Sequence, residues 1–197
     1  IGYYAFSGCS SLTSVDIPDG VTVIYDETFY NCSSLTDIDL PDNLTSIGKS
    51  AFSSCDSLES VILPAQLTCI KSEAFAFCKS LREVNIPSNV AAIEESAFTY
   101  CESLQSVVLP ERLTYIGKDA FSRCRSLNSV VFPSGVRAIG EDAFFDCRSL
   151  QKAVLTDSVI SIGEGAFDLC NNLTIYAPVG SYAHDYATAN GISFSPM

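Results

Sequence analysis

Apolar residues recur along the chain with a period of 23 residues. Phenylalanine occupies one column of this period, cysteine follows three residues later, and leucine three residues after that. The columns are Phe6, Phe29, Phe52, Phe75, Phe98, Phe121, Phe144 and Phe167; Cys9, Cys32, Cys55, Cys78, Cys101, Cys124, Cys147 and Cys170; and Leu12, Leu35, Leu58, Leu81, Leu104, Leu127, Leu150 and Leu173. Eight copies in register, without an insertion, indicate a stack of equivalent structural repeats.

Each unit opens with a short alternation of apolar and polar residues, as in Leu-Thr-Asp-Ile-Asp-Leu at 35–40. The alternation predicts a short strand with one buried face. In six units a proline follows, which marks the end of the strand because proline cannot donate to a sheet ladder. A second apolar pair, such as Leu44 and Ile47, predicts another extended segment.

The remainder of each unit predicts a turn and a short helical stretch. Gly48, Gly117, Gly140 and Gly163 are expected to supply a turn with a permissive φ. The residues that follow, as at 140–147, begin with acidic side chains and suit one or two helical turns. One such unit cannot bury its own apolar residues, whereas a stack of units can.

The repeat L-x-x-(I/V)-x-(I/L)-P-x-x-(L/V)-x-x-I-G-x-x-A-F-x-x-C-x-x, over residues 1 to about 173, resembles the BspA-type leucine-rich repeat. The run from Tyr176 to Phe194 resembles the closing segment of secreted bacterial members. The resemblance implies an α/β fold: a right-handed solenoid with a parallel sheet on its concave side and short extended or helical turns on its convex side. It also implies a secreted or cell-surface bacterial protein used in adhesion or protein binding.

The chain divides into a solenoid, residues 1–176, and a C-terminal cap, residues 177–197. In the cap, Tyr182, Ala183, Tyr186 and Ala187 form a helical stripe, with Ser181 as candidate N-cap and Gly191 just past the end. Residues 192–194 predict a short final strand. The first unit lacks its strand half, so we expect the natural chain to continue upstream. The column where many leucine-rich repeats carry an asparagine ladder holds only Asn43 and Asn89, so no continuous ladder is expected.

Charge narrows the possible partners. The chain has 197 residues, 47% of them apolar, and a formal net charge of −12. This charge argues against nucleic acid and anionic membrane surfaces as partners. No segment approaches the roughly 18 consecutive apolar residues of a membrane-spanning helix, so no direct membrane insertion is expected.

The cysteine column has two interpretations. Stacked repeats place equivalent Cα atoms roughly 5 Å apart, within the disulfide range, but their Cβ vectors point the same way. We therefore expect buried free thiols, with occasional disulfides as the alternative. No close Cys-x-x-Cys pair suggests zinc. Cys69 lies outside the column and is either a reactive thiol or a packed side position.

No residue pattern indicates catalysis. The single histidine, His184, has no serine or cysteine column near it in the sequence, and no phosphate-binding glycine loop or cofactor motif is present. Residues 1–48 hold seven acidic residues and no Lys or Arg, so a calcium site near Asp16 and Asp39 is conceivable, although no calcium loop occurs. Arg123, Arg125 and Arg148 predict a small basic spot of the kind that most often forms a solvated rim.

The outward positions of the opening strands are the candidate binding residues, because strand side chains alternate between the two faces. One outward column reads Asp16, Asp39, Ile62, Asn85, Val108, Val131 and Val154, and its neighbour reads Ser14, Asp37, Ser60, Glu83, Ser106, Ser129 and Lys152. The face passes from acidic to aliphatic, and a contiguous exposed apolar area marks a binding site. The alternative interpretations are β-branched propensity, or cover by another part of the full protein. The predicted site is Asp16, Asp37, Asp39, Ile62, Asn85, Val108, Val131 and Val154.

Two functional hypotheses remain, neither of them catalytic. The first is a cell-surface or secreted module that binds a protein or glycan through the concave sheet. The second is a spacer or stalk of a larger surface protein with no ligand of its own. An enzyme would need an active site outside the repeats.

Overall fold

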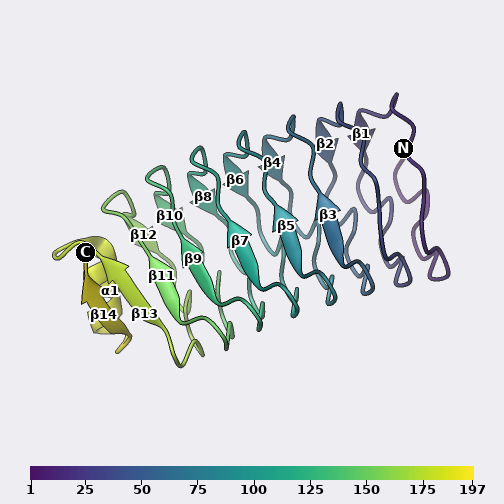
Figure 1. The fold of residues 1–197 in the computed structure, drawn as a ribbon. Helices are drawn as coiled ribbons and strands as arrows, with labels where there is room; N and C mark the ends of the chain where they lie inside the picture. The colour runs from purple at the N-terminus through teal and green to yellow at the C-terminus, as the bar shows by residue number, and fades with distance from the viewer.

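The computed structural model describes residues 1–197 as a stack of similar coils that ends in one helix (Figure 1). Each coil contributes strands to two rows, and neighbouring coils pair in parallel. The long-strand row holds β3 (Ser60–Ile62), β5 (Glu83–Asn85), β7 (Ser106–Val108), β9 (Ser129–Val131), β11 (Lys152–Val154) and β13 (Thr174–Ala177). The short-strand row holds β1 (Val23–Ile24), β2 (Ser46–Ile47), β4 (Cys69–Ile70), β6 (Ala92–Ile93), β8 (Tyr115–Ile116), β10 (Ala138–Ile139) and β12 (Ser161–Ile162). Both predicted extended segments are therefore confirmed, in a parallel-strand solenoid.

The hydrogen-bonded ladders are not equally continuous in the two rows. The short-strand row forms β1-β2 and the five-stranded sheet β12-β10-β8-β6-β4. The long-strand row forms β3-β5-β7 and β14-β13-β11-β9, where β14 is Ser193–Pro196. Nearer the N-terminus it is represented by a single parallel bridge between Asp16 and Asp39.

A stack of phenylalanine rings fills the centre of the solenoid. The eight rings lie nearly parallel, with neighbouring centroids 5.2–5.5 Å apart and ring planes 5–11° apart. From Phe29 onward every ring is buried. Tyr186 of helix α1 (Tyr182–Ala189) closes the stack edge-on, 6.2 Å from Phe167. The 23-residue repeat thus superposes identical groups, and offset stacking adds to the free energy gained by burying them.

The cysteine column forms a second ladder beside the rings. Seven of its thiols, Cys32 through Cys170, donate from Sγ to the carbonyl oxygen of the phenylalanine one coil earlier, at 3.1–3.3 Å. All nine cysteines of the chain are free, and these seven are buried. The expectation of buried free thiols is confirmed for them, while Cys9 is exposed.

The predicted helical turns between the glycine position and the cysteine are wrong. Two residues of each coil in this segment have a positive φ, as in Ser50 (52°) and Ser54 (62°). A left-handed residue at every fourth position interrupts a right-handed helix. The amides of Ser50, Phe52 and Ser54 instead donate to carbonyl oxygens of the next coil, at 2.7–3.0 Å. The segment is a ladder of turns. The predicted α/β fold is therefore a solenoid of strands and turns that contains a single helix.

The role predicted for the repeated glycines is also wrong. Gly48, Gly117, Gly140 and Gly163 do not have a positive φ. A Cβ at any of them would lie 2.3–2.6 Å from a backbone atom of the preceding coil. The equivalent position of other coils is occupied by Tyr25, Lys71 and Glu94, which have a Cβ. The close approach to the preceding coil is therefore confined to the coils that carry glycine. These glycines are required by the contact between coils and not by turn geometry.

The predictions for the asparagine column and the C-terminal helix agree with the structure, and the final strand is Ser193–Pro196 where residues 192–194 were predicted. Asn43 and Asn89 each donate from Nδ2 to a carbonyl of the preceding coil, Asp19 and Ala65 respectively, as isolated rungs without a continuous ladder. Ser181 caps α1 by accepting the His184 amide at 3.3 Å. Gly191 follows the helix with φ 66°, and β14 pairs in parallel with β13.

Replacing Gly140 by alanine tests the close approach between coils. The new Cβ would meet backbone atoms of Gly117 and Lys118 at 2.5 Å. We expect the free energy of unfolding to fall by about 1–3 kcal/mol, measured by urea denaturation. Gly20→Ala is the matched control, because nothing lies within 4 Å of its Cβ position; its stability should stay within about 0.5 kcal/mol of the parent. Equal urea midpoints for the two variants would contradict this account.

Candidate functional site

The outward side of the long-strand row, here called the long-strand face, consists of the Asp16–Val154 row and the Ser14–Lys152 row named above. In β3, β5, β7 and β9 the burial pattern is exposed, buried, exposed, so the middle residue packs inward and its two neighbours project into solvent. Alternation along the strand thus places the two rows side by side on one surface. This is the surface predicted from the sequence as the concave one.

The aliphatic members of the Asp16–Val154 row are unusually exposed for their type. Ile62, Val108 and Val131 are 77%, 78% and 59% exposed, whereas Val154 is half-buried. Val131 pairs directly with Val154 in the ladder between β9 and β11. Val108 and Val131 belong to separate sheets, although both line one hollow of about 420 Å³. The predicted valine stack is therefore continuous as a surface but not as a hydrogen-bonded sheet.

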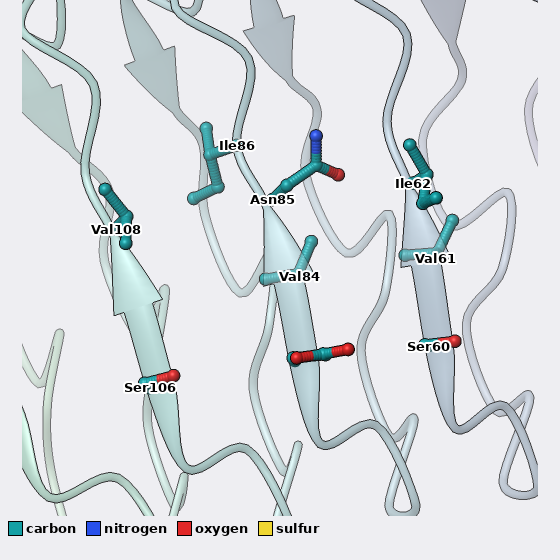
Figure 2. Close-up of a pocket in the computed structure, with 9 residues that line it drawn as sticks. Ser60, Val61, Ile62, Val84, Asn85, Ile86, Ser106 and Val108 are labelled. Carbon is teal, nitrogen blue, oxygen red and sulfur yellow. The ribbon is translucent and has the colours of Figure 1, made fainter.

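A larger hollow of about 630 Å³ lies over β3, β5 and β7. Figure 2 shows Ile62, Asn85 and Val108 along one side and the hydroxyls of Ser60 and Ser106 along the other. Asn85 Oδ1 accepts the backbone amide of Leu63 at 2.9 Å, which fixes the side chain across two coils. Its Nδ2 group and both serine hydroxyls make no hydrogen bond within the chain, so they are free to bind a ligand.

The predicted acidic residues lie together at the N-terminal end of the same face. Asp16 and Asp39 are bridged partners, and with Ser14 and Asp37 they line a hollow of about 210 Å³. None of the seven ion pairs of the chain involves Asp16, Asp37 or Asp39. No group of three or more His, Cys, Asp or Glu side chains is placed to hold a metal ion. Like charges on adjacent strands repel one another, so this end carries uncompensated negative charge.

The C-terminal end of the face carries a positive charge. Lys152 belongs to the Ser14–Lys152 row, and its Nζ lies 5.0 Å from the ring centroid of Tyr176. A lysine over a tyrosine ring gains a cation–π interaction. The face thus runs from the unpaired carboxylates of Asp16, Asp37 and Asp39 to an ammonium group. Its middle part combines exposed aliphatic side chains with serines, Asn85 and the single carboxylate of Glu83.

The predicted basic spot is an ion-pair cluster and not a free patch. Arg125 donates from Nε and Nη2 to one oxygen of Asp146, and Arg148 Nε donates to the other at 2.7 Å. Asp146 is buried, and the two guanidinium groups lower the pKa of its carboxyl against the opposing effect of burial. Arg123 lies 4.7 Å from the ring centroid of Tyr100. The repeat pattern did not predict the pairing of Asp146 with Arg125, because Arg125 lies 21 residues away in the preceding coil.

The contacts of His184 connect parts of the C-terminal cap. Its Nδ1 accepts the backbone amide of Gly180 at 3.0 Å, and its ring lies 4.3 Å from that of Phe194. These contacts join the start of α1 to β14.

The thiols differ sharply in their surroundings. Burial raises the pKa of Cys55 to about 12, and it raises that of Cys101 further. Burial, with a hydrogen bond to the Glu94 carboxylate at 3.3 Å, raises the pKa of Cys69 to about 12. The reactive-thiol interpretation of Cys69 is therefore disfavoured, and the exposed thiol is Cys9.

The fold is a repeat solenoid with an open face of variable outward residues. The chain belongs to the family described as BspA type leucine rich repeat region, which matches in six copies over residues 1–105 and 91–181. No helix is long and apolar enough to span a membrane.

Three solved bacterial structures share the fold. A leucine-rich repeat protein of T. pallidum is 29% identical with a TM-score of 0.77, over 94% of this chain and 85% of that one. The pneumococcal vaccine antigen PcpA is 19% identical with a TM-score of 0.67, over 91% of this chain but 47% of its own. A leucine-rich repeat protein of Eubacterium ventriosum is 16% identical with a TM-score of 0.56, over 87% of this chain and 68% of that one. No curated protein matches in sequence.

Thiol labelling of the native protein tests the cysteine assignments. At pH 8 an alkylating reagent should modify Cys9 first, because the thiolate is the reacting species. Cys69 should react about 10³-fold more slowly than an ordinary thiol with a pKa near 8.5, and the seven buried columnar thiols only after unfolding. Peptide mapping by mass spectrometry identifies the sites, and Cys9→Ser should abolish the fast phase. Labelling of Cys69 at the rate of Cys9 would refute the assignment.

Proposed function

We propose that the chain is a non-catalytic binding module, secreted or displayed at a cell surface, that recognises a protein or glycan through the long-strand face. The observation that carries the proposal is the exposure of Ile62, Val108 and Val131 on one regular surface. Apolar side chains that cluster on a solvent-exposed surface indicate an interaction site. The neighbouring hollow with free hydroxyl and amide groups supports it.

Strand propensity alone does not account for these residues. β-Branched side chains suit any half-buried strand position, yet they are confined to one of the two outward rows. The Ser14–Lys152 row, on the same strands and equally exposed, holds Ser60, Ser106 and Ser129. A general preference for valine and isoleucine would have filled both rows, so the selective placement favours a role in binding.

The extracellular location rests on relatives. The chain belongs to a family that includes bacterial repeat proteins, and PcpA is described as a pneumococcal vaccine antigen. This chain spans about half of PcpA. A surface location for the present protein is part of the proposal.

A binding assay with two matched substitutions tests the proposal. Val131→Asp places a charge in the aliphatic part of the face, and Ile160→Asp does the same at an equally exposed position outside it, 60% against 59% exposed. Binding to immobilised extracellular proteins or to a glycan array should weaken at least about tenfold in Val131→Asp and stay unchanged in Ile160→Asp. Circular dichroism confirms that both variants fold.

The second candidate is a spacer or stalk. The uninterrupted stack of Phe rings favours it, because a continuous core makes a stiff rod. If the chain is a stalk, it should bind neither the immobilised proteins nor the glycan array. Alternatively, any binding should be affected equally by Val131→Asp and Ile160→Asp. Either outcome would reject the long-strand face as a binding site.

A further inference from the structure

The two ends of the long-strand face differ in charge and polarity, and this difference restricts the kind of partner that can bind there. Asp16, Asp37 and Asp39 present unpaired carboxylates at the N-terminal end. Val108 and Val131 present aliphatic groups further along, where Lys152 adds a positive charge. A partner with basic groups over the aspartates and apolar groups over the valines complements both ends, and the reverse orientation places its cations against Lys152.

We propose that the ligand of this face is an extended polypeptide laid along the solenoid axis, with basic side chains over Asp16, Asp37 and Asp39 and apolar side chains over Val108, Val131 and Val154. The proposal rests on the proposed binding function and specifies its partner.

The polar groups of the face suit a peptide backbone. Ser60, Ser106 and Ser129 lie in one row with hydroxyls that make no hydrogen bond within the chain, and Asn85 Nδ2 is free beside them. An extended backbone needs donors and acceptors along its length, because unmade hydrogen bonds are costly. The aliphatic row beside these polar groups provides apolar contacts for alternate side chains of the extended peptide.

A glycan fits the face less well. Sugar rings commonly bind proteins by stacking their C–H faces on aromatic rings. Neither row contains an aromatic residue from Ser14 to Val154. Tyr176, which pairs with Val154 at the end of the ladder, is half-buried and its ring is approached by Lys152. The exposed aromatic side chains lie elsewhere, as with Tyr25, Phe77 and Tyr115. The exposed apolar groups of the rows are isopropyl and sec-butyl groups, which match aliphatic peptide side chains.

The dimensions set the length of the peptide. Six coil steps separate Asp16 from Val154, about 29 Å at ~4.8 Å per step, which an extended peptide spans with about nine residues. The midpoint of Asp16 and Asp39 lies about 22 Å from Val131 by the same spacing, or six to seven residues at ~3.3 Å each. The ligand should therefore separate its basic and apolar residues by about six positions.

Selection from a displayed library of random 12-residue peptides against the full 197-residue chain tests this directly. We expect enriched sequences in which Lys or Arg occupies one half and Leu, Ile, Val or Phe the other, about six positions apart. The affinity of an enriched synthetic peptide, measured by fluorescence anisotropy, should fall at least about tenfold with Asp39→Lys and with Val131→Asp. It should change less than about twofold with the controls Glu164→Lys and Ile160→Asp, which lie outside the face.

Asp39→Asn serves as the milder variant if Asp39→Lys fails to fold. Enrichment without segregated basic and apolar halves would overturn the proposal, as would enriched peptides that bind Asp39→Lys and Asp39→Asn as well as the parent. A glycan-array signal sensitive to Val131→Asp, without any peptide enrichment, would also overturn it while leaving the binding function intact. Absence of binding in the peptide selection, on the glycan array and to immobilised extracellular proteins would reject the binding function itself.

Discussion

Phenylalanine rings stacked at 5.2–5.5 Å tie each coil of the solenoid to the next, and the thiol ladder beside them locks the same register. Each buried cysteine donates to the phenylalanine carbonyl one coil earlier, so ring and thiol columns both require a unit of constant length. An insertion in a coil would move its ring and thiol off their neighbours. The parallel strands, the turn ladders and the close glycine contacts all depend on this common spacing.

Because the core columns take up the inward positions, the outward positions of the long strands are free to vary. The stack determines where they lie, one per coil in straight rows, and their chemistry determines what they can bind. This division explains how one surface can pass from Asp16 and Asp39 to Val108 and Val131 while the core beneath it stays constant. The chain belongs to a family of such repeats, and the residues that would select the proposed ligand lie in the variable rows.

The sequence predicted the features that depend on residue type and period. These include the core columns, both extended segments, Ser181 as the cap of α1, and the composition of the candidate face. It failed where the hydrogen-bond partner lies in another coil. The turn amides bond to the next coil and not four residues back, and Gly140 faces the backbone of its neighbour. The pairing of Asp146 with Arg125 and the hollow over Asn85 likewise exist only once the coils are stacked.

The central claim is that the inward columns hold the fold and the long-strand face contributes little to it. Equilibrium urea unfolding of two variants of one coil tests this most directly. Phe98→Ala removes a fully buried ring and should lower the free energy of unfolding by about 3–5 kcal/mol. Val108→Ser alters a side chain that is 78% exposed and should stay within about 0.5 kcal/mol of the parent. A loss in Val108→Ser comparable to that in Phe98→Ala would show that the face belongs to the stabilising core, and would contradict the account.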